Sequence, residues 1–267
     1  MKVVISLFIG FLLFTQQDVF CQKKGKLSQP KQKQKLKAKP VPPTLEQLVK
    51  LQQYSYPYYA IINNGPSPIS GCFISYKNIS YFVTTRHSFY TTTNERRKIT
   101  NVMIFMDPDN MKNNTKVLSL NMTEQNLLPV CFDFGCTDII LLPVIIPKEQ
   151  SVNYVTLESK ENIDGKDMAI VGYIKDSINI IKTRFDSFLN RDSTYFLTEK
   201  SSAKDQSGAP VLIYSINKGV SKVTLAGVYS GKEISQELFD KGLVSRAHYI
   251  SMFLNSKTKE ELLGKEQ

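Results

Sequence analysis

The sequence has 267 residues, of which 42% are hydrophobic and 22% are charged, and it carries a net charge of +10. About 220 residues remain after two unusual N-terminal segments, which is enough for one globular unit. No stripe of basic residues interleaved with aromatic ones occurs in that part, so we exclude a nucleic-acid function.

Residues 1–21 have the pattern of a cleaved secretory signal peptide. One lysine precedes an apolar run too short for a membrane span, and Val19 and Cys21 stand three residues and one residue before the expected cleavage site. In the alternative, Cys21 is the lipidated residue of a lipoprotein, but the Asp18-Val-Phe before it is a poor match to a small-residue lipobox. No later segment is apolar over a membrane-spanning length. We therefore expect a secreted or periplasmic protein without stable membrane insertion.

Residues 22–43 are predicted to be a disordered basic linker. The segment is rich in Lys, Gln and Pro, contains eight lysines and has no acidic residue. Because Lys2 and Asp18 cancel upstream, it carries eight of the ten net positive charges, and residues 44–267 carry only two. A run of like charge with low hydrophobicity stays solvated. A spacer or removable propeptide is preferred over a segment that binds anionic lipid, cell wall or nucleic acid.

Residues 44–267 predict one β-rich domain. Short segments alternate apolar and polar residues and are rich in β-branched and aromatic side chains, and turn clusters such as Asn63–Pro66 separate them. The predicted strands are Tyr58–Ile62, Cys72–Tyr76, Tyr81–Thr84, Val102–Phe105, Val117–Leu120 and Val223–Val228. One helix is expected at Thr44–Gln53, where Thr44 and Gln47 form a capping pattern, and another near Lys257–Leu263.

Three residues indicate a nucleophilic site. His87 follows the strand-like Phe82-Val-Thr-Thr-Arg, Asp138 precedes the apolar run Ile139–Leu142, and Ser207 is followed by Gly-Ala-Pro. A seryl hydroxyl needs an imidazole to take its proton and a carboxylate to hold that imidazole in the useful tautomer. The order His, Asp, Ser is that of chymotrypsin and not that of subtilisin or the α/β-hydrolases. The trio predicts a serine protease.

Other interpretations of these residues stay open. Asp133, five residues before Asp138, could compete for the acid role, but the run behind Asp138 predicts a buried strand, where an orienting acid belongs. His248 is the only other histidine, and we expect it to be structural or exposed in the last strand. A structural or adhesive β-protein with an accidental trio would not bring His87, Asp138 and Ser207 together.

The segments around the trio resemble the trypsin-like, chymotrypsin-fold serine peptidases, particularly compact bacterial secreted members. The residues that carry the likeness are Val83–His87, Asp138–Leu142 and Ser207–Pro210, with further likeness at Gly71–Ile74, Ile170–Tyr173, Leu225–Gly231 and Val244–Phe253. It covers roughly residues 55–255. The resemblance implies an all-β fold of two packed six-stranded antiparallel barrels with a short C-terminal helix. It also implies a monomeric endopeptidase that takes a protein or peptide substrate.

The resemblance implies a role for each site residue. His87 is general base and then acid, Asp138 orients it, Ser207 attacks the scissile carbonyl, and the backbone N–H groups of Asp205 and Ser207 hold the oxyanion. The residues implied for the substrate pocket are Ser201, Val228, Tyr229 and Ser230. A neutral Ser201 gives no electrostatic reason for specificity toward Lys or Arg. Residues 228–230 contain no histidine that would indicate a glutamate-binding pocket. Primary specificity stays open.

Asp205 departs from the family pattern, which has glycine at this position. A side chain there can disfavour the required backbone conformation, and a carboxylate beside a developing oxyanion is electrostatically unfavourable. Losing one oxyanion donor costs on the order of 100- to 1,000-fold in rate. Alternatively Asp205 points to solvent beside Lys204, or the hole forms only when substrate binds. A trypsin-fold protein that binds peptides or proteins without efficient cleavage is therefore the second functional hypothesis.

Three cysteines remain after signal removal. Cys131 and Cys136 flank four residues just before Asp138, and in an oxidising compartment a disulfide there could brace the acid strand. Cys72 would then be unpaired and buried. No His, Cys and carboxylate cluster has zinc spacing, and no phosphate-binding glycine loop occurs, so neither a metal nor a cofactor is expected.

Overall fold

The structure is a computed structural model. It describes residues 57–63, 65, 68–105, 117–122, 127–157, 162–174, 177–189, 194–202, 206–217, 220–232 and 240–263. The predicted signal peptide, the basic linker, the helix at Thr44–Gln53 and the oxyanion candidate Asp205 lie outside the described residues.

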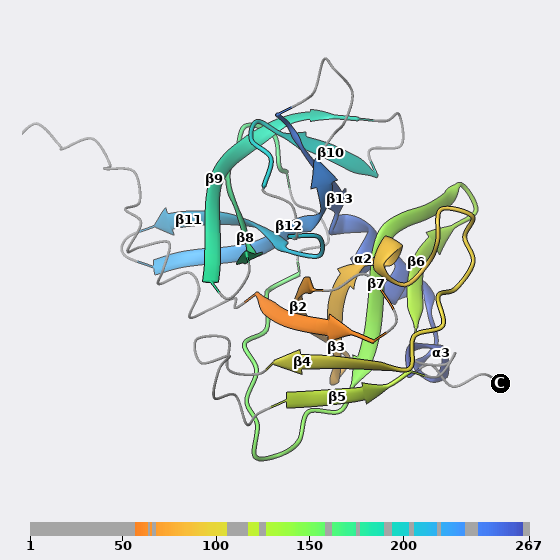
Figure 1. Ribbon diagram of the computed structural model, residues 1–267. Coiled ribbons are helices and arrows are strands. Elements are labelled where there is room, and N and C mark those ends of the chain that lie inside the picture. Colours follow the sequence, from red (N-terminus) through yellow and green to blue (C-terminus); the bar gives the residue numbers. More distant parts are fainter. Residues whose placement is uncertain are drawn as a thin grey trace, which may run out of the picture. The chain divides into compact units, whose positions relative to one another are not determined.

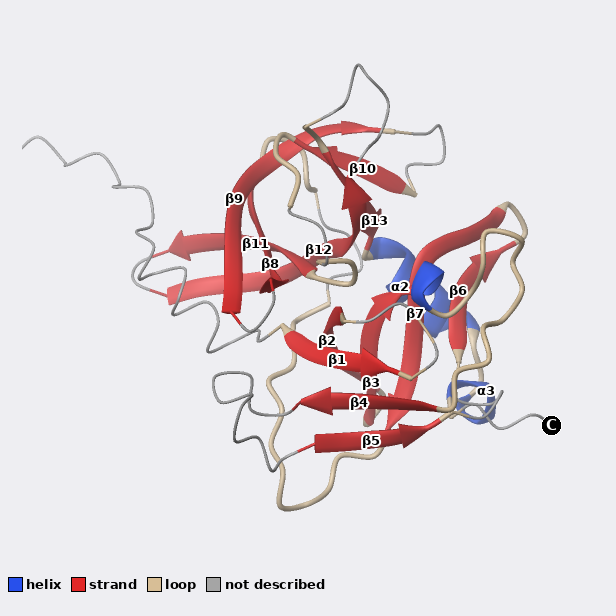
Figure 2. Ribbon diagram, in the orientation of Figure 1, coloured by secondary structure: helices blue, strands red, loops and turns tan. Residues whose placement is uncertain are grey.

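Strands dominate the described residues, and the α-helices lie near the C-terminal end of the chain (Figures 1 and 2). In chain order the elements are β1 (Tyr58–Ile62), β2 (Ile69–Tyr76), β3 (Ile79–Thr85), the 3-10 turn η1 (Arg86–Ser88), β4 (Asn101–Phe105), β5 (Val117–Asn121), β6 (Leu128–Phe132), β7 (Gly135–Val144), β8 (Asp167–Ile174), β9 (Ser177–Phe188), β10 (Tyr195–Thr198), β11 (Pro210–Asn217), β12 (Val220–Lys232), β13 (Gly242–Arg246), α2 (His248–Ser256) and α3 (Lys259–Leu262).

The first seven strands form one curled antiparallel sheet in the order β5-β4-β1-β2-β3-β7-β6. Its central strands are buried on both faces: Phe73, Phe82 and Ile140 belong to one hydrophobic cluster, while neighbours of opposite orientation such as Val83 and Leu141 belong to another. A closed six-stranded barrel was expected here. The sheet instead has seven strands because residues 128–132 add β6 beside β7, and among the described residues its edge strands β5 and β6 are not paired with each other.

The second half of the chain forms a closed six-stranded antiparallel barrel in the order β10-β13-β12-β11-β8-β9. Its interior is filled by a cluster that includes Ile170, Phe196, Val211, Tyr229 and Val244. A further cluster contains side chains from the first sheet, the barrel and α2 together. The sheet and the barrel therefore share one continuous core, and the all-β, chymotrypsin-like fold class is confirmed.

The C-terminal helices differ in detail from the expectation. The last strand ends at Arg246, and His248, which was expected in a strand, begins α2. The reason is that the buried residues of α2, Tyr249, Ile250, Phe253 and Leu254, recur at helical spacing and pack on the shared core. A separate helix, α3, begins after Thr258, whose side chain forms a capping box with Glu261. None of the described helices is long and apolar enough to cross a membrane.

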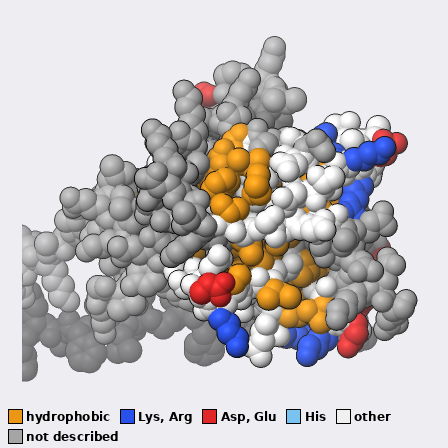
Figure 3. Space-filling view, turned by 60° about the horizontal axis from the view of Figure 1, so that its bottom comes forward, with side chains coloured by type: hydrophobic (Ala, Val, Ile, Leu, Met, Phe, Trp, Pro, Cys, Tyr) orange, Lys and Arg blue, Asp and Glu red, His pale blue; other side chains and the backbone are white. Residues whose placement is uncertain are grey.

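Figure 3 shows one face of the molecule, on which hydrophobic side chains lie among uncharged polar ones and charged side chains lie nearer the edge. Ile145 is the most exposed large hydrophobic residue described, at 91%, followed by Phe134 at 54%. More than half of the surface of an ordinary folded protein is apolar. These exposed side chains therefore indicate no function by themselves.

Cys72 is the free cysteine of the described residues, and we expect it to be unreactive. Burial in β2 raises the pKa of its thiol to about 12, and the thiolate is the reactive form. The protein beginning at Gln22 should resist iodoacetamide when folded and take up one equivalent when denatured without reductant, as counted by mass spectrometry. Rapid labelling of the folded protein would contradict the burial of Cys72. Three equivalents in denaturant would contradict a Cys131–Cys136 disulfide.

Candidate active site

His87 lies in η1, directly after the buried strand β3. The chain turns there because the backbone N–H groups of Phe89 and Tyr90 both donate to the carbonyl oxygen of Arg86. Beneath the turn, the buried hydroxyls of Thr85 and Ser88 are 2.9 Å apart and hydrogen-bonded. The His87 side chain is left 45% exposed. The end of β3 therefore presents an accessible imidazole on a firmly hydrogen-bonded turn.

Asp138 holds His87 with both carboxylate oxygens. Strand β7 pairs with β3 so that Ile139 lies opposite Thr85, which places Asp138 beside η1. Its Oδ1 accepts the backbone N–H of His87 at 2.8 Å, and its Oδ2 lies 2.7 Å from Nδ1 of the ring. An ionised carboxylate only accepts hydrogen bonds, so Nδ1 carries the proton and donates. In a neutral imidazole Nε2 is then the acceptor, as a general base requires.

A disulfide lies close to the acid on the same hairpin. Cys131 and Cys136 are directly opposite each other in the β6–β7 pair and are bonded, with their Cα atoms 3.9 Å apart. Asp138 follows two residues later, and its side chain is 15% exposed. The expected bridge is therefore present at the start of the acid strand. Asp133 lies in the exposed hairpin turn between the two cysteines, whereas Asp138 is the carboxylate that binds His87.

Tyr195 reaches the acid from the barrel and was not predicted. Its phenol is hydrogen-bonded to the side chain of Ser245 and to the backbone of Asp138. Burial raises the pKa of Tyr195, and the charge of Asp138 adds to the effect. The chain of hydroxyls continues from Ser245 to Ser230, 3.0 Å away. No sequence signal marks Tyr195 or Ser245, because each is a single polar residue on a different strand.

Ser207 lies in the turn that leads into β11, and this turn is wedged between the barrel and the first sheet. The backbone N–H of Ser70 in β2 donates to the carbonyl oxygen of Ser207 at 2.9 Å, and that of Gly208 donates to Tyr229 at 2.9 Å. Gly208 has φ +89°, and a Cβ atom there would lie 2.3 Å from the hydroxyl of Thr84. The turn that carries Ser207 is thus packed against Thr84 of β3, which lies three residues before His87.

The structure therefore brings His87 and Asp138 into direct contact and packs the Ser207 turn against the strand that carries His87. Within the described part of the chain, no hydrogen bond joins the Ser207 hydroxyl to the imidazole. Such bonds are often long in a protease without substrate and tighten when substrate binds. Asp205, the second proposed oxyanion donor, lies outside the described residues.

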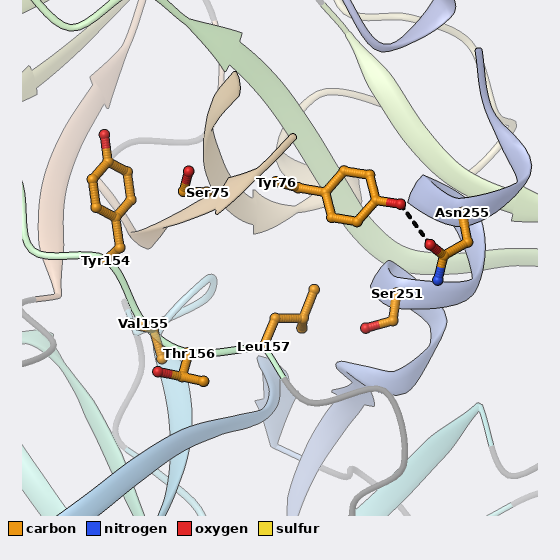
Figure 4. Close-up of a pocket in the computed structure, with 8 residues that line it drawn as sticks. All are labelled: Ser75, Tyr76, Tyr154, Val155, Thr156, Leu157, Ser251 and Asn255. Atoms are coloured by element: carbon orange, nitrogen blue, oxygen red, sulfur yellow. Dashed lines mark hydrogen bonds between the residues drawn. The ribbon is translucent and has the colours of Figure 1, made fainter. Parts of the chain in front are cut away.

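A separate pocket of about 410 Å³ lies between β2, the segment at residues 154–157 and α2 (Figure 4). The hydroxyl of Tyr76 donates to Asn255 across one end of it. Its lining residues are Ser75, Tyr76, Tyr154, Val155, Thr156, Leu157, Ser251 and Asn255. None of them belongs to the candidate active site, so the pocket is not the substrate cleft expected from the sequence.

A solved structure of similar fold is known. The chain aligns with the serine endoprotease from Yersinia pestis over 81% of this chain and 67% of that chain, with 12% identity and a TM-score of 0.53. The chain has the chymotrypsin fold. A catalytically inactive tobacco etch virus protease complexed with substrate aligns over 77% of this chain and 86% of that chain, with 12% identity and a TM-score of 0.48. No protein-family model and no curated protein sequence matches the chain.

Four pocket residues were expected from the chymotrypsin fold, and the structure places them differently from one another. Ser201 and Ser230 are partly exposed. Val228 is fully buried and belongs to the core cluster that the first sheet, the barrel and α2 share, so its side chain is not accessible to a substrate. Tyr229 points the opposite way, into the barrel, and is 2% exposed.

Proposed function

We propose that the protein is a serine-type endopeptidase that hydrolyses peptide bonds in a protein or peptide substrate. The observation that supports this most directly is the carboxylate of Asp138, which binds both the backbone N–H and Nδ1 of His87. This arrangement leaves Nε2 as the basic nitrogen on an accessible ring. Ser207 lies in a turn packed against β3, the strand that leads to His87, and is the proposed nucleophile.

The proposed reaction proceeds through an acyl-enzyme. The Ser207 oxygen bonds to the scissile carbonyl carbon while its proton moves to Nε2 of His87. The carbon–nitrogen bond then breaks, and the imidazolium gives that proton to the leaving amine. A water molecule attacks the ester, its proton passes to Nε2, and the proton returns to Ser207 as the ester bond breaks. Asp138 stays ionised throughout and stabilises the imidazolium.

Backbone donors are proposed to stabilise the oxyanion of the tetrahedral intermediates. The N–H of Ser207 is one of them, and that of Asp205 is the other. Because Asp205 replaces glycine, we expect this enzyme to be slower than one in which both donors are unhindered. No metal or cofactor takes part in this scheme.

We also propose that residues 1–21 direct export and are removed, so that the protein works in a secreted or periplasmic location. The Cys131–Cys136 disulfide supports this, because disulfides persist mainly in oxidising compartments. N-terminal sequencing of the exported protein should begin at Gln22. A protein retained with its first 21 residues, or lipidated at Cys21, would contradict this part of the proposal.

The central test is labelling of the protein beginning at Gln22 with an alkyl fluorophosphonate, which phosphonylates activated serines. We expect labelling of Ser207 that depends on a group titrating near neutral pH and that is lost in Ser207→Ala. Ser75→Ala, which removes an exposed serine outside the site, is the matched control and should label normally. No labelling of a folded protein would favour a peptide-binding protein. Recovery in Asp205→Gly would then identify the oxyanion hole as the defect.

A further inference from the structure

Strand β12 offers an open edge beside the proposed nucleophile. From Gly227 to Tyr229 the strand is bonded on both sides: it pairs with β13, while Val228 lies opposite Pro210 of β11 and the N–H of Tyr229 donates to the carbonyl oxygen of Ala209 at 2.9 Å. Beyond that point, residues 231 and 232 pair with β13, and no partner on the other side occurs among the described residues. A Cβ atom at Gly231 would meet nothing within 4 Å. An extended peptide can add to such an edge.

A peptide added to this edge would pass Ser207, because Gly208 is hydrogen-bonded to Tyr229 at the point where the edge opens. Tyr229 is the last residue of β12 that pairs with the Ser207 turn, and β12 bulges between Tyr229 and Gly231. A substrate residue that enters at the start of the open edge would therefore lie next to Tyr229. That residue is the one whose carbonyl would meet Ser207.

The Tyr229 side chain is fixed in place. Its hydroxyl accepts the backbone N–H of Ser202 at 3.0 Å and donates to the carbonyl oxygen of Ser202 at 3.3 Å. The ring packs over Gly242 of β13, where a Cβ atom would come 3.0 Å from the ring edge. Burial raises the pKa of Tyr229, so the phenol stays protonated and can keep donating.

The wall opposite Tyr229 is also fixed. The N–H of Ser201 donates to the carbonyl oxygen of Asp240 at 2.7 Å, next to the segment that the phenol binds. The ring therefore bridges β12 and residues 201–202, which lead into the Ser207 turn. Because the Tyr229 ring lies between β12 and residues 201–202 and is bonded to Ser202, it leaves no room there for a large substrate side chain.

We propose that Tyr229 closes the primary specificity pocket and restricts the residue before the scissile bond to small, uncharged side chains such as those of Gly, Ala and Ser. This inference rests on the proposed function, since it concerns the substrate of the same site. It makes Tyr229 a specificity-determining residue, while the neighbouring Val228 lies in the core and does not meet the substrate.

The test compares two diphenyl phosphonates that differ only in carrying a methyl or a benzyl side chain. Each reacts with an activated serine by forming a P–O bond and releasing phenol. The wild-type protein should react with the methyl reagent on the order of 100-fold faster or more, because a filled pocket cannot accept the benzyl group. Tyr229→Ala should lower that ratio by about 10-fold or more, and Tyr229→Val by a smaller factor. In Tyr229→Phe, which keeps the ring, the ratio should stay within about threefold of wild type.

Each outcome decides something. A wild-type ratio near one, or a benzyl preference, overturns the inference without any variant and leaves the proposed function intact. An unchanged ratio in folded Tyr229→Ala or Tyr229→Val overturns it as well. Failure of the alkyl fluorophosphonate, which has no side chain to place in the pocket, overturns the proposed function and the inference with it. If Tyr229→Ala does not fold, the wild-type ratio and Tyr229→Val decide.

Discussion

Replacing Asp138 by asparagine is expected to lower the rate of fluorophosphonate labelling about 10,000-fold, the size of effect seen when the acid of a triad becomes an amide. The carboxylate accepts two hydrogen bonds from His87, one from the backbone and one from Nδ1. An amide has only one accepting oxygen. If that oxygen keeps the backbone bond, the NH₂ group faces the ring and forces Nδ1 to be the acceptor. The proton then sits on Nε2, and the base is lost.

The opposite orientation of the amide is no better. Its oxygen would keep the ring proton in place, but its NH₂ group would then face the backbone N–H of His87, and two donors would be opposed. Either way the pair is broken by a change that removes almost no volume. The variant should therefore fold, and its thermal unfolding should be close to that of the wild-type protein.

Asp133→Asn is the matched control. It is also an aspartate of the β6–β7 hairpin, five residues away, and its exposed side chain lies in the turn between the two bonded cysteines. We expect its labelling rate to change less than about twofold, as for an ordinary surface substitution. A large loss in Asp133→Asn together with a normal rate in Asp138→Asn would reverse the assignment of the acid. Normal labelling rates in both variants would show that the bonds between Asp138 and His87 do not activate Ser207, which would contradict the proposed function.

Much of this pair could be predicted from the sequence because its signals are local. An apolar run next to a polar residue predicts that the polar residue ends or begins a buried strand. Such a run lies before His87, at residues 81–83, and another lies after Asp138, at residues 139–142. The spacing of Cys131 and Cys136 is equally local, and the disulfide is present. The strand at Tyr58–Ile62 was predicted with the bounds that it has in the structure.

The contacts that the sequence did not reveal join distant strands. Tyr195 reaches Asp138 from another sheet, and the Tyr229 hydroxyl binds Ser202 across the barrel, so no neighbour in sequence marks either contact. Val228 and Tyr229 were given the same role although successive residues of a strand point to opposite faces. The seventh strand of the first sheet was missed because β6 contains Pro129 and shows no regular alternation.

The position after the proposed nucleophile is the most constrained glycine of the candidate site. Gly208 has φ +89°, which a residue with a side chain rarely adopts, and a Cβ atom would lie 1.9 Å from the carbonyl oxygen of Ser70. That oxygen already accepts the hydroxyl of Thr84 at 2.7 Å and belongs to a buried strand, so it has little room to move. The cost of an added methyl group therefore falls on the Ser207 turn, which must move away from β2 and β3.

Gly208→Ala should accordingly lower the labelling rate at least about 100-fold, because a displacement near 1 Å of a reacting group costs that much. Gly165→Ala separates this effect from strain alone. Gly165 also has a positive φ, +64°, but a Cβ atom there meets nothing within 4 Å. It should lose about 1 kcal/mol of stability and label at the wild-type rate. Equal losses of labelling in the two variants would point to general destabilisation. A normal rate in Gly208→Ala would mean that contact with β2 and β3 does not position Ser207.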